Sequence, residues 1–138
     1  MECKIVISDP ETGKSYQKEL KDDRAKHFKS LKIGSEFDGG VLGLADYKLS
    51  ITGGSDRSGF PMRRGIHGTT RSMVLSKGGV GYNPLKSERI RKRMRGEMVS
   101  DDISQINVKI IKKGSKSLEE SLGIAPKEEK KAEEKPAE

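Results

Sequence analysis

The sequence is poor in the residues that form disulfides, metal centres and stacking surfaces. Its 138 residues include one cysteine, two histidines, no tryptophan, three tyrosines and three phenylalanines. The single cysteine, Cys3, cannot form an internal disulfide, and two histidines do not supply the ligand set of a structural zinc site. We therefore expect a protein of the reducing cytoplasm that binds no metal and no other cofactor.

Long apolar runs are also absent. No stretch approaches the roughly 18 apolar residues of a membrane span, and residues 1–7 lack the long apolar core and cleavage site of a signal peptide. The length and a hydrophobic content of 31% predict one domain with a small core. These features argue against a multidomain enzyme, a membrane partner and a small-molecule substrate.

Positive charge, in contrast, is abundant and concentrated in the middle of the chain. The whole chain carries a formal net charge of +7, whereas residues 57–95 hold eleven basic side chains and one acid, a net charge of +10, so the remaining residues together carry −3. Unopposed like charges repel one another unless a polyanion neutralises them. Arginine supplies eight of the eleven, and its flat guanidinium pairs with phosphate oxygens. The segment therefore predicts a nucleic-acid-binding surface.

The candidate nucleic-acid-binding residues are these basic side chains together with one histidine that lies among them. A packing role within the loop is an equally good interpretation of that histidine. The candidates are Arg57, Arg63, Arg64, His67, Arg71, Lys77, Lys86, Arg89, Arg91, Lys92, Arg93 and Arg95.

The alternation of apolar and polar residues predicts a mainly β fold. Residues 3–7 and 16–20 read as a β-hairpin, and residues 47–51 as a strand that Gly53 and Gly54 break. Residues 72–75 are strand-like, and residues 96–100 and 103–111 read as two closing strands joined at a turn. We expect a small barrel-like or rolled antiparallel sheet, in which closure protects the strand edges.

Helical signals are few. Asp22 or Asp23 can cap a short helix that ends at Gly34, whereas for residues 87–95 a short basic helix and a basic arm remain open. Beyond Gly114, the spacing from Ser117 to Glu120 fits a capping box. The predicted organisation is a β-rich RNA-binding domain over residues 1–114, a short helical segment over 115–124, and a disordered tail rich in Lys and Glu over 125–138.

Catalytic and nucleotide-binding patterns find no support. Residues 13–15 imitate the end of a phosphate-binding loop, but Ser8 stands where its first glycine is needed. Residues 79–81 begin like a dinucleotide fingerprint, but Pro84 stands in place of the third glycine. Neither histidine has a cysteine or serine at a recognisable catalytic spacing. We therefore expect no enzymatic activity.

Residues 51–62 contain the most specific pattern in the chain. A hydrophobic residue and a small one precede the run Gly-Gly-x-Asp-x-x-Gly-Phe-Pro-Met, without a gap. This run resembles the signature of the small-subunit ribosomal protein six family of archaea and eukaryotes. Further similar stretches extend the resemblance to roughly residues 3–114. The signature residues here are Gly53, Gly54, Asp56, Gly59, Phe60, Pro61 and Met62.

The signature also has a physical interpretation. Its glycines allow tight turns and close backbone approach, Asp56 can accept hydrogen bonds from backbone donors of the turn, and Pro61 fixes the local direction of the chain. We expect Phe60 and Met62 to anchor the loop on the core.

The resemblance implies a structural constituent of the small ribosomal subunit, ribosome-associated in the cytoplasm and acting in translation. Its implied partners are small-subunit rRNA and other small-subunit ribosomal proteins. Eukaryotic members end in a long basic extension with phosphorylated serines, whereas this chain has no serine after Ser121. The phosphorylation role is therefore not transferred, and the chain resembles the short archaeal form.

The sequence also limits the kind of RNA contact. Only Phe60 and Tyr82 among the six aromatic residues fall within residues 57–95, which is little provision for stacking splayed bases. We therefore expect contacts to phosphates and sugars of folded RNA. The alternative is a free-standing RNA-binding or nucleoid-type protein, which shares the charge argument but not the signature.

Overall fold

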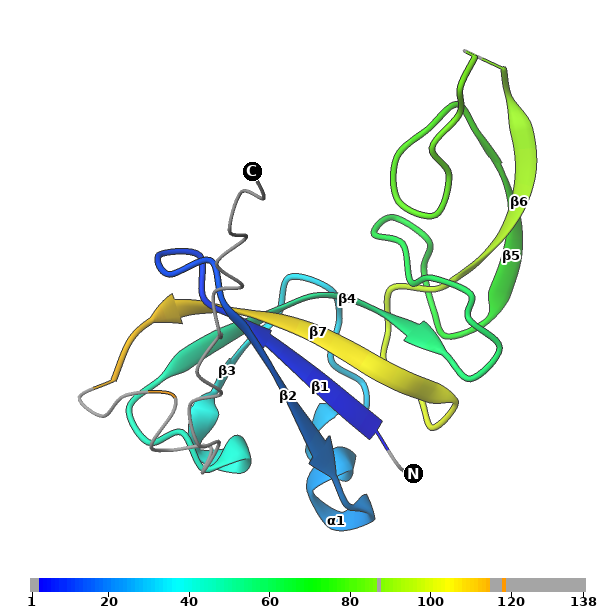
Figure 1. Ribbon diagram of the computed structural model, residues 1–138. Coiled ribbons are helices and arrows are strands. Elements are labelled where there is room, and N and C mark those ends of the chain that lie inside the picture. Colours follow the sequence, from blue (N-terminus) through cyan, green and yellow to red (C-terminus); the bar gives the residue numbers. More distant parts are fainter. Residues whose placement is uncertain (1–2, 87, 115–117, 119–138) are drawn as a thin grey trace, which may run out of the picture.

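The computed structural model describes residues 3–86, 88–114 and 118. Strands account for most of its regular structure (Figure 1), and η denotes a 3₁₀ helix. The elements in chain order are β1 (Cys3–Ser8), β2 (Ser15–Leu20), α1 (Asp22–Ala25), η1 (Lys26–Phe28), β3 (Glu36–Asp38), η2 (Gly39–Leu42), β4 (Lys48–Asp56), β5 (Arg71–Ser76), β6 (Ile90–Arg95) and β7 (Ile103–Lys112).

Five strands form the main sheet, which we call the body together with the segments packed on it. The strand order is β2-β1-β7-β4-β3. The predicted hairpin is present as β1 and β2, and β7 lies in the centre between β1 and β4. The pair of β1 and β7 is parallel, while the other pairs are antiparallel. The mainly β class is thus confirmed, in a sheet whose strand order is open and whose pairing is mixed.

The two ends of this strand order approach each other. The Lys18 ammonium of β2 donates a 2.7 Å hydrogen bond to the carbonyl oxygen of Leu42, in the turn that follows β3. Strands twist with a fixed hand, and this twist accumulates across the five strands of the sheet. The sheet is therefore rolled around its inner face.

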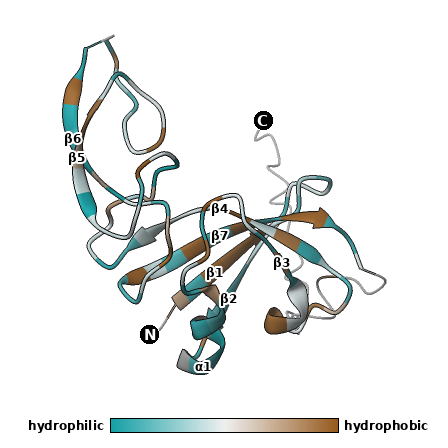
Figure 2. Ribbon diagram, turned by 180° about the vertical axis from the view of Figure 1, so that it is seen from behind, coloured by the Kyte–Doolittle hydropathy of each residue, from teal (hydrophilic) through white to brown (hydrophobic). Residues whose placement is uncertain are grey.

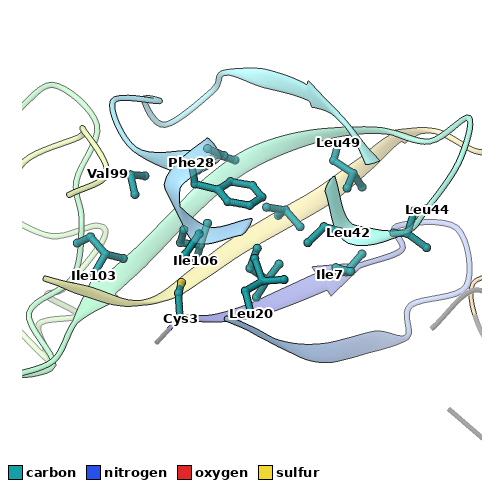
Figure 3. Packing of buried hydrophobic residues seen from close by; sticks show 14 of the residues in the cluster. Cys3, Ile7, Leu20, Phe28, Leu42, Leu44, Leu49, Val99, Ile103 and Ile106 are labelled. Atoms are coloured by element: carbon teal, nitrogen blue, oxygen red, sulfur yellow. The ribbon is translucent and has the colours of Figure 1, made fainter. Parts of the chain in front are cut away.

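That inner face holds the hydrophobic core (Figure 3). The alternating residues of β1, β4 and β7, among them Ile7, Leu49 and Ile106, are almost completely buried. Phe28 of η1 and Leu42 of η2 cover them from the open side of the sheet. Full burial of side chains of this size stabilises a fold by roughly 1.5–3 kcal/mol each, so this cluster holds the body together.

The strands β5 and β6 form a separate two-stranded sheet, which projects from the body (Figure 1). We call residues 71–95 the arm. Backbone hydrogen bonds hold its base: Arg95 donates to Pro61, and Arg63 donates to Arg95. Figure 2 shows hydrophobic segments among the hydrophilic ones on the arm, and five large hydrophobic residues there are exposed. They are Met73, Leu75, Val80, Leu85 and Ile90.

Two predicted breaks and one predicted strand are wrong. Gly53 and Gly54 do not end their strand, because β4 continues to Asp56 through shifts in its pairing with β7. The predicted helix ends at Phe28 instead of Gly34, and residues 96–100 form one isolated bridge instead of a strand. The cause is the same for both segments, since Ser30, Leu31 and Ile33 exchange backbone hydrogen bonds with Val99 and Glu97. These tertiary bonds hold both segments in an irregular extended form.

The remaining expectations fare differently. The basic stretch before residue 95 forms strand β6, which agrees with an arm and excludes a helix over Ile90–Arg95. Of the predicted helical segment 115–124 the structure describes only Leu118, which is buried against the core. The predicted tail 125–138 lies outside the described residues. In the described part of the chain, no helix is long and apolar enough to cross a membrane.

Candidate nucleic-acid interface

The signature loop is built around the carboxylate of Asp56, at the end of β4. Asp56 Oδ1 accepts hydrogen bonds from the backbone N–H groups of Ser58 (3.0 Å) and Phe60 (2.9 Å). Gly59 has a φ of +85°, a conformation that glycine adopts without strain, and its N–H donates to the Asp56 carbonyl. The prediction that Asp56 satisfies the donors of this turn is therefore confirmed.

The same loop is anchored in the body through Met62. Met62 is 1% exposed within the core cluster, and its N–H donates a 2.8 Å hydrogen bond to Gly54 of β4. The anchoring expected of Met62 is confirmed. Phe60 is only half-buried. The guanidinium carbon of Arg71 lies over its ring, 4.8 Å from the ring centre, in a cation–π contact.

Asp56 also ties the loop to the arm. Its Oδ2 accepts a 2.7 Å hydrogen bond from Arg71 Nε of β5 and lies 3.6 Å from the guanidinium of Arg95 of β6. Burial by itself raises the pKa of this carboxyl, but the Phe60 N–H and then the hydrogen bond and charge of Arg71 outweigh it, so its pKa lies below the usual value. Asp56 is therefore ionised at neutral pH and holds two strands of the arm in place.

Arg95 differs from the other candidates because it lies inside the protein. The residue is 6% exposed, and one terminal nitrogen donates to Ser100 Oγ and Asp102 Oδ2, each at 2.8 Å. The guanidinium of Arg95 and its charge hold the pKa of Asp102 below its usual value. The carboxylates of Asp56 and Asp102 match the charge of Arg95, which therefore fixes the junction of arm and body.

Arg63 and His67 are also engaged with protein groups. Arg63 is half-buried, and its guanidinium donates to Ser76 Oγ (2.9 Å) and contacts Met94 Sδ (3.5 Å), both on the arm. His67 is exposed, with its Nδ1 3.3 Å from the Glu97 carboxylate. A hydrogen bond from Gly65, followed by that of His67, lowers the pKa of Glu97. Arg63 therefore contributes to the packing between the loop and the arm, whereas His67 stays exposed beside Glu97.

Most of the candidates nevertheless face solvent, in the arm and the loop before it. Besides the exposed His67 and the partly exposed Arg71, eight basic candidate residues are exposed. They are Arg57, Arg64, Lys77, Lys86, Arg89, Arg91, Lys92 and Arg93.

The arm presents two different faces. In the register of β5 and β6, Arg91 stands opposite Leu75 and Arg93 opposite Met73, so these four exposed side chains share one face. On the other face the Lys92 ammonium lies 5.4 Å from the centre of the Tyr82 ring. Cations thus project from both sides of a narrow two-stranded sheet.

The described residues also bear on metal binding and nucleophilic chemistry. Within residues 3–86, 88–114 and 118, no three histidine, cysteine or acidic side chains are grouped to hold a metal ion. Burial raises the pKa of the Cys3 thiol to about 11, so that thiol is not a nucleophile at neutral pH.

The count of charges over residues 57–95 missed two acidic residues that contact this surface. Asp102 and Glu97 lie outside residues 57–95 and reach Arg95 and His67 only through the fold. The sequence predicts that Asp102 lies in a turn, and the structure agrees. The residues next to it in the sequence do not indicate that it pairs with Arg95.

Comparison with known families places the chain among the ribosomal proteins. It belongs to the ribosomal protein S6e family, whose model matches residues 3–123. The expected resemblance is confirmed, and this is a family of structural ribosomal proteins, not of enzymes.

Archaeal relatives support the assignment over nearly their whole lengths. The chain is 51% identical over 130 residues to the small ribosomal subunit protein eS6 of Methanosphaera stadtmanae, covering 94% of this chain and 98% of that protein. It is 52% identical over 124 residues to the protein of the same name from Methanothermobacter thermautotrophicus, covering 89% and 97%. The Haloarcula marismortui protein of that name is 45% identical over 123 residues, covering 88% and 95%. Family membership confirms the expected ribosome-associated location in the cytoplasm.

Proposed function

We propose that the chain is a structural constituent of the small ribosomal subunit that binds rRNA through the exposed cations of the arm and of the loop over residues 57–70. Other small-subunit proteins are its expected neighbours. The observation that carries the proposal is the concentration of exposed cations on one projecting part of a small β body, within a stretch that contains one acid. A surface of one sign is stable where a polyanion neutralises it.

The structure favours contacts to phosphates and sugars over base stacking by the arm. Both aromatic rings of the basic segment are already covered by cations, Phe60 by Arg71 and Tyr82 by Lys92. Arginine and lysine projecting from both faces of a thin sheet suit the phosphates of folded, partly double-helical RNA. Arg95 is not part of this proposed contact, and Arg63 and Arg71 contribute mainly by holding the arm.

Sedimentation of a lysate tests this function. The chain is followed by antibody through a gradient at moderate and at high salt. Co-migration with small subunits at both salts supports a stably integrated ribosomal protein. Recovery only from light fractions contradicts it and favours a free-standing RNA-binding or nucleoid-type protein.

A further inference from the structure

A hollow of about 750 Å³ lies on the outer face of the main sheet, apart from the arm's exposed strands. Its floor is formed by β4 and β7, including Gly53, Asn107 and Lys109. Ile33 lies on one side, and Arg64 and Val80 are also part of the lining. A hollow of this size is within the range of ligand sites in proteins.

Neither a positive φ nor crowding at Cβ requires glycine at position 53 of this floor. The φ of Gly53 lies outside the left-handed region, and a Cβ built on it meets no atom within 4 Å. Gly54 beside it is different, because a Cβ there meets the carbonyl oxygen of Gln105 and lies 3.1 Å from Met62 Sδ. The fold therefore requires glycine at position 54 and would accept a side chain at 53.

The register shows where a side chain at position 53 would point. Gly53 stands opposite Asn107 across the β4–β7 pair, so both project from the same face, the one opposite the core. Asn107 lines the hollow, so a Cβ at 53 would occupy its floor. The absence of a side chain leaves a strip of bare backbone that a flat group can approach closely.

The groups around this strip match one nucleotide of RNA. The apolar side chains of Ile33 and Val80 can flank a base, while Arg64 and Lys109 supply two positive charges for phosphate. Glu36 is the one acid in the lining. The amide of Asn107 is oriented by a 2.8 Å hydrogen bond from Gln105 Nε2 to its Oδ1, which leaves the Asn107 amino group as a donor to a base edge. Bases that leave a stack are recognised through such flat apolar contacts and edge hydrogen bonds.

We propose that this hollow binds a single unstacked nucleotide of rRNA, with its base against the backbone at Gly53. The proposal rests on the rRNA binding proposed above and adds a contact to one base, on the outer face of the main sheet where Arg64 of the loop and Val80 of the arm border it. It assigns to Gly53 the role of keeping the floor open.

The test compares two glycine substitutions that the fold should tolerate equally. Gly53→Val fills the floor. Gly40→Val is the matched control, because Gly40 also has an ordinary φ and open space at its Cβ but lies in η2, away from the hollow. Melting temperatures should be close to that of the unsubstituted protein for both variants. The probe is transcribed small-subunit rRNA, with affinity measured by titration and base accessibility by chemical modification.

We expect Gly53→Val to weaken rRNA binding by about tenfold, because a side chain at position 53 removes the base from its contacts in the hollow; this corresponds to about 1.4 kcal/mol. One base protected by the unsubstituted protein should become reactive in the Gly53→Val complex, while Gly40→Val keeps both affinity and protection. Unchanged affinity and protection with Gly53→Val would overturn the proposal. So would normal binding to naked rRNA combined with loss from assembled subunits, which would mean that a protein segment fills the hollow. If the unsubstituted protein itself fails to bind rRNA, the proposed function fails first.

Discussion

At the scale of single residues, Asp56 connects the body, the signature loop and the arm. It closes the turn through two backbone N–H groups and holds Arg71 and Arg95 through its second oxygen. The side chain is fully buried. A buried carboxylate stabilises a protein when its charge and its hydrogen-bonding capacity are both matched, and here both are.

Removal of this carboxylate should be costly. Asp56→Ala leaves Arg95 buried with only the surface carboxylate of Asp102 as a charged partner and leaves two turn donors unsatisfied. We expect a loss of about 3–5 kcal/mol in the free energy of unfolding. Urea denaturation followed by circular dichroism measures it. A loss below about 1 kcal/mol would contradict the role given to Asp56.

Asp56→Asn is the control that separates charge from shape. The amide oxygen can still accept hydrogen bonds from Ser58 and Phe60, although the amino group in place of Oδ2 cannot accept the one from Arg71, so the loss should be smaller than that of Asp56→Ala. Because the pKa of Asp56 is lowered in the fold, its contribution is present above the unfolded value of about 3.9 and disappears as the pH falls towards the folded value. The difference in stability between the unsubstituted protein and Asp56→Asn should therefore shrink as the pH is lowered below about 4.

At the scale of elements, the arm is the feature that concentrates charge. Its two strands pair with each other, and hydrogen bonds around Arg95 hold them to the body. The exposed cations along β6 therefore contribute little to the stability of the fold. Arg91 and Arg93 are exposed on the face they share with Met73 and Leu75. Their substitution should therefore affect binding and not stability.

The double variant Arg91→Ala/Arg93→Ala tests this separation. If both side chains meet phosphates, the slope of log affinity for rRNA against log salt should fall by about two, with no change in circular dichroism or melting temperature. The matched control is Lys4→Ala/Lys26→Ala, which removes the same charge from exposed positions on the body. An equal effect of the two double variants would show that net charge matters and that the arm has no special part.

Elements were predictable from the sequence where side chains alternate between core and solvent. The β1–β2 hairpin and β7 follow from that pattern, since burial of one face decides their register. The pattern failed at Gly53 and Gly54, where pairing with β7 overrides the weak strand propensity of glycine. It also failed at residues 96–100, whose partners around Leu31 are remote in the sequence.

The candidate surface was predictable in charge but not in geometry. The count over residues 57–95 located the basic segment, yet it could not distinguish exposed Arg93 from buried Arg95, two positions away on the same strand. That distinction depends on Asp56 and Asp102, which reach Arg95 only in the folded protein. The hollow at Gly53 also escaped prediction, because a glycine that serves the fold and one that opens a surface look alike in a sequence.

At the scale of the whole molecule, the charge is asymmetric: residues 57–95 carry +10 and the rest −3. Binding to free rRNA should accordingly be governed by the release of counterions from the RNA. If some six cations meet phosphates, affinity should fall by on the order of a thousandfold between about 50 and 200 mM salt. Filter binding across that range measures it. An affinity independent of salt would refute binding through the arm.

The parallel pair of β1 and β7 has a consequence for how the protein is made. The Ser8 hydroxyl of β1 donates a hydrogen bond to the Val108 carbonyl of β7, 100 residues later in the chain. The strand β1 can therefore pair with β7 only after the residues between them have been synthesised. The arm pairs locally, with Ser76 opposite Ile90, and can form as soon as β6 has emerged. The two strands of the positively charged hairpin are therefore both synthesised before β7, the central strand of the main sheet. Because β1 and β4 both pair with β7, the main sheet cannot be completed until the residues of the arm have already been made.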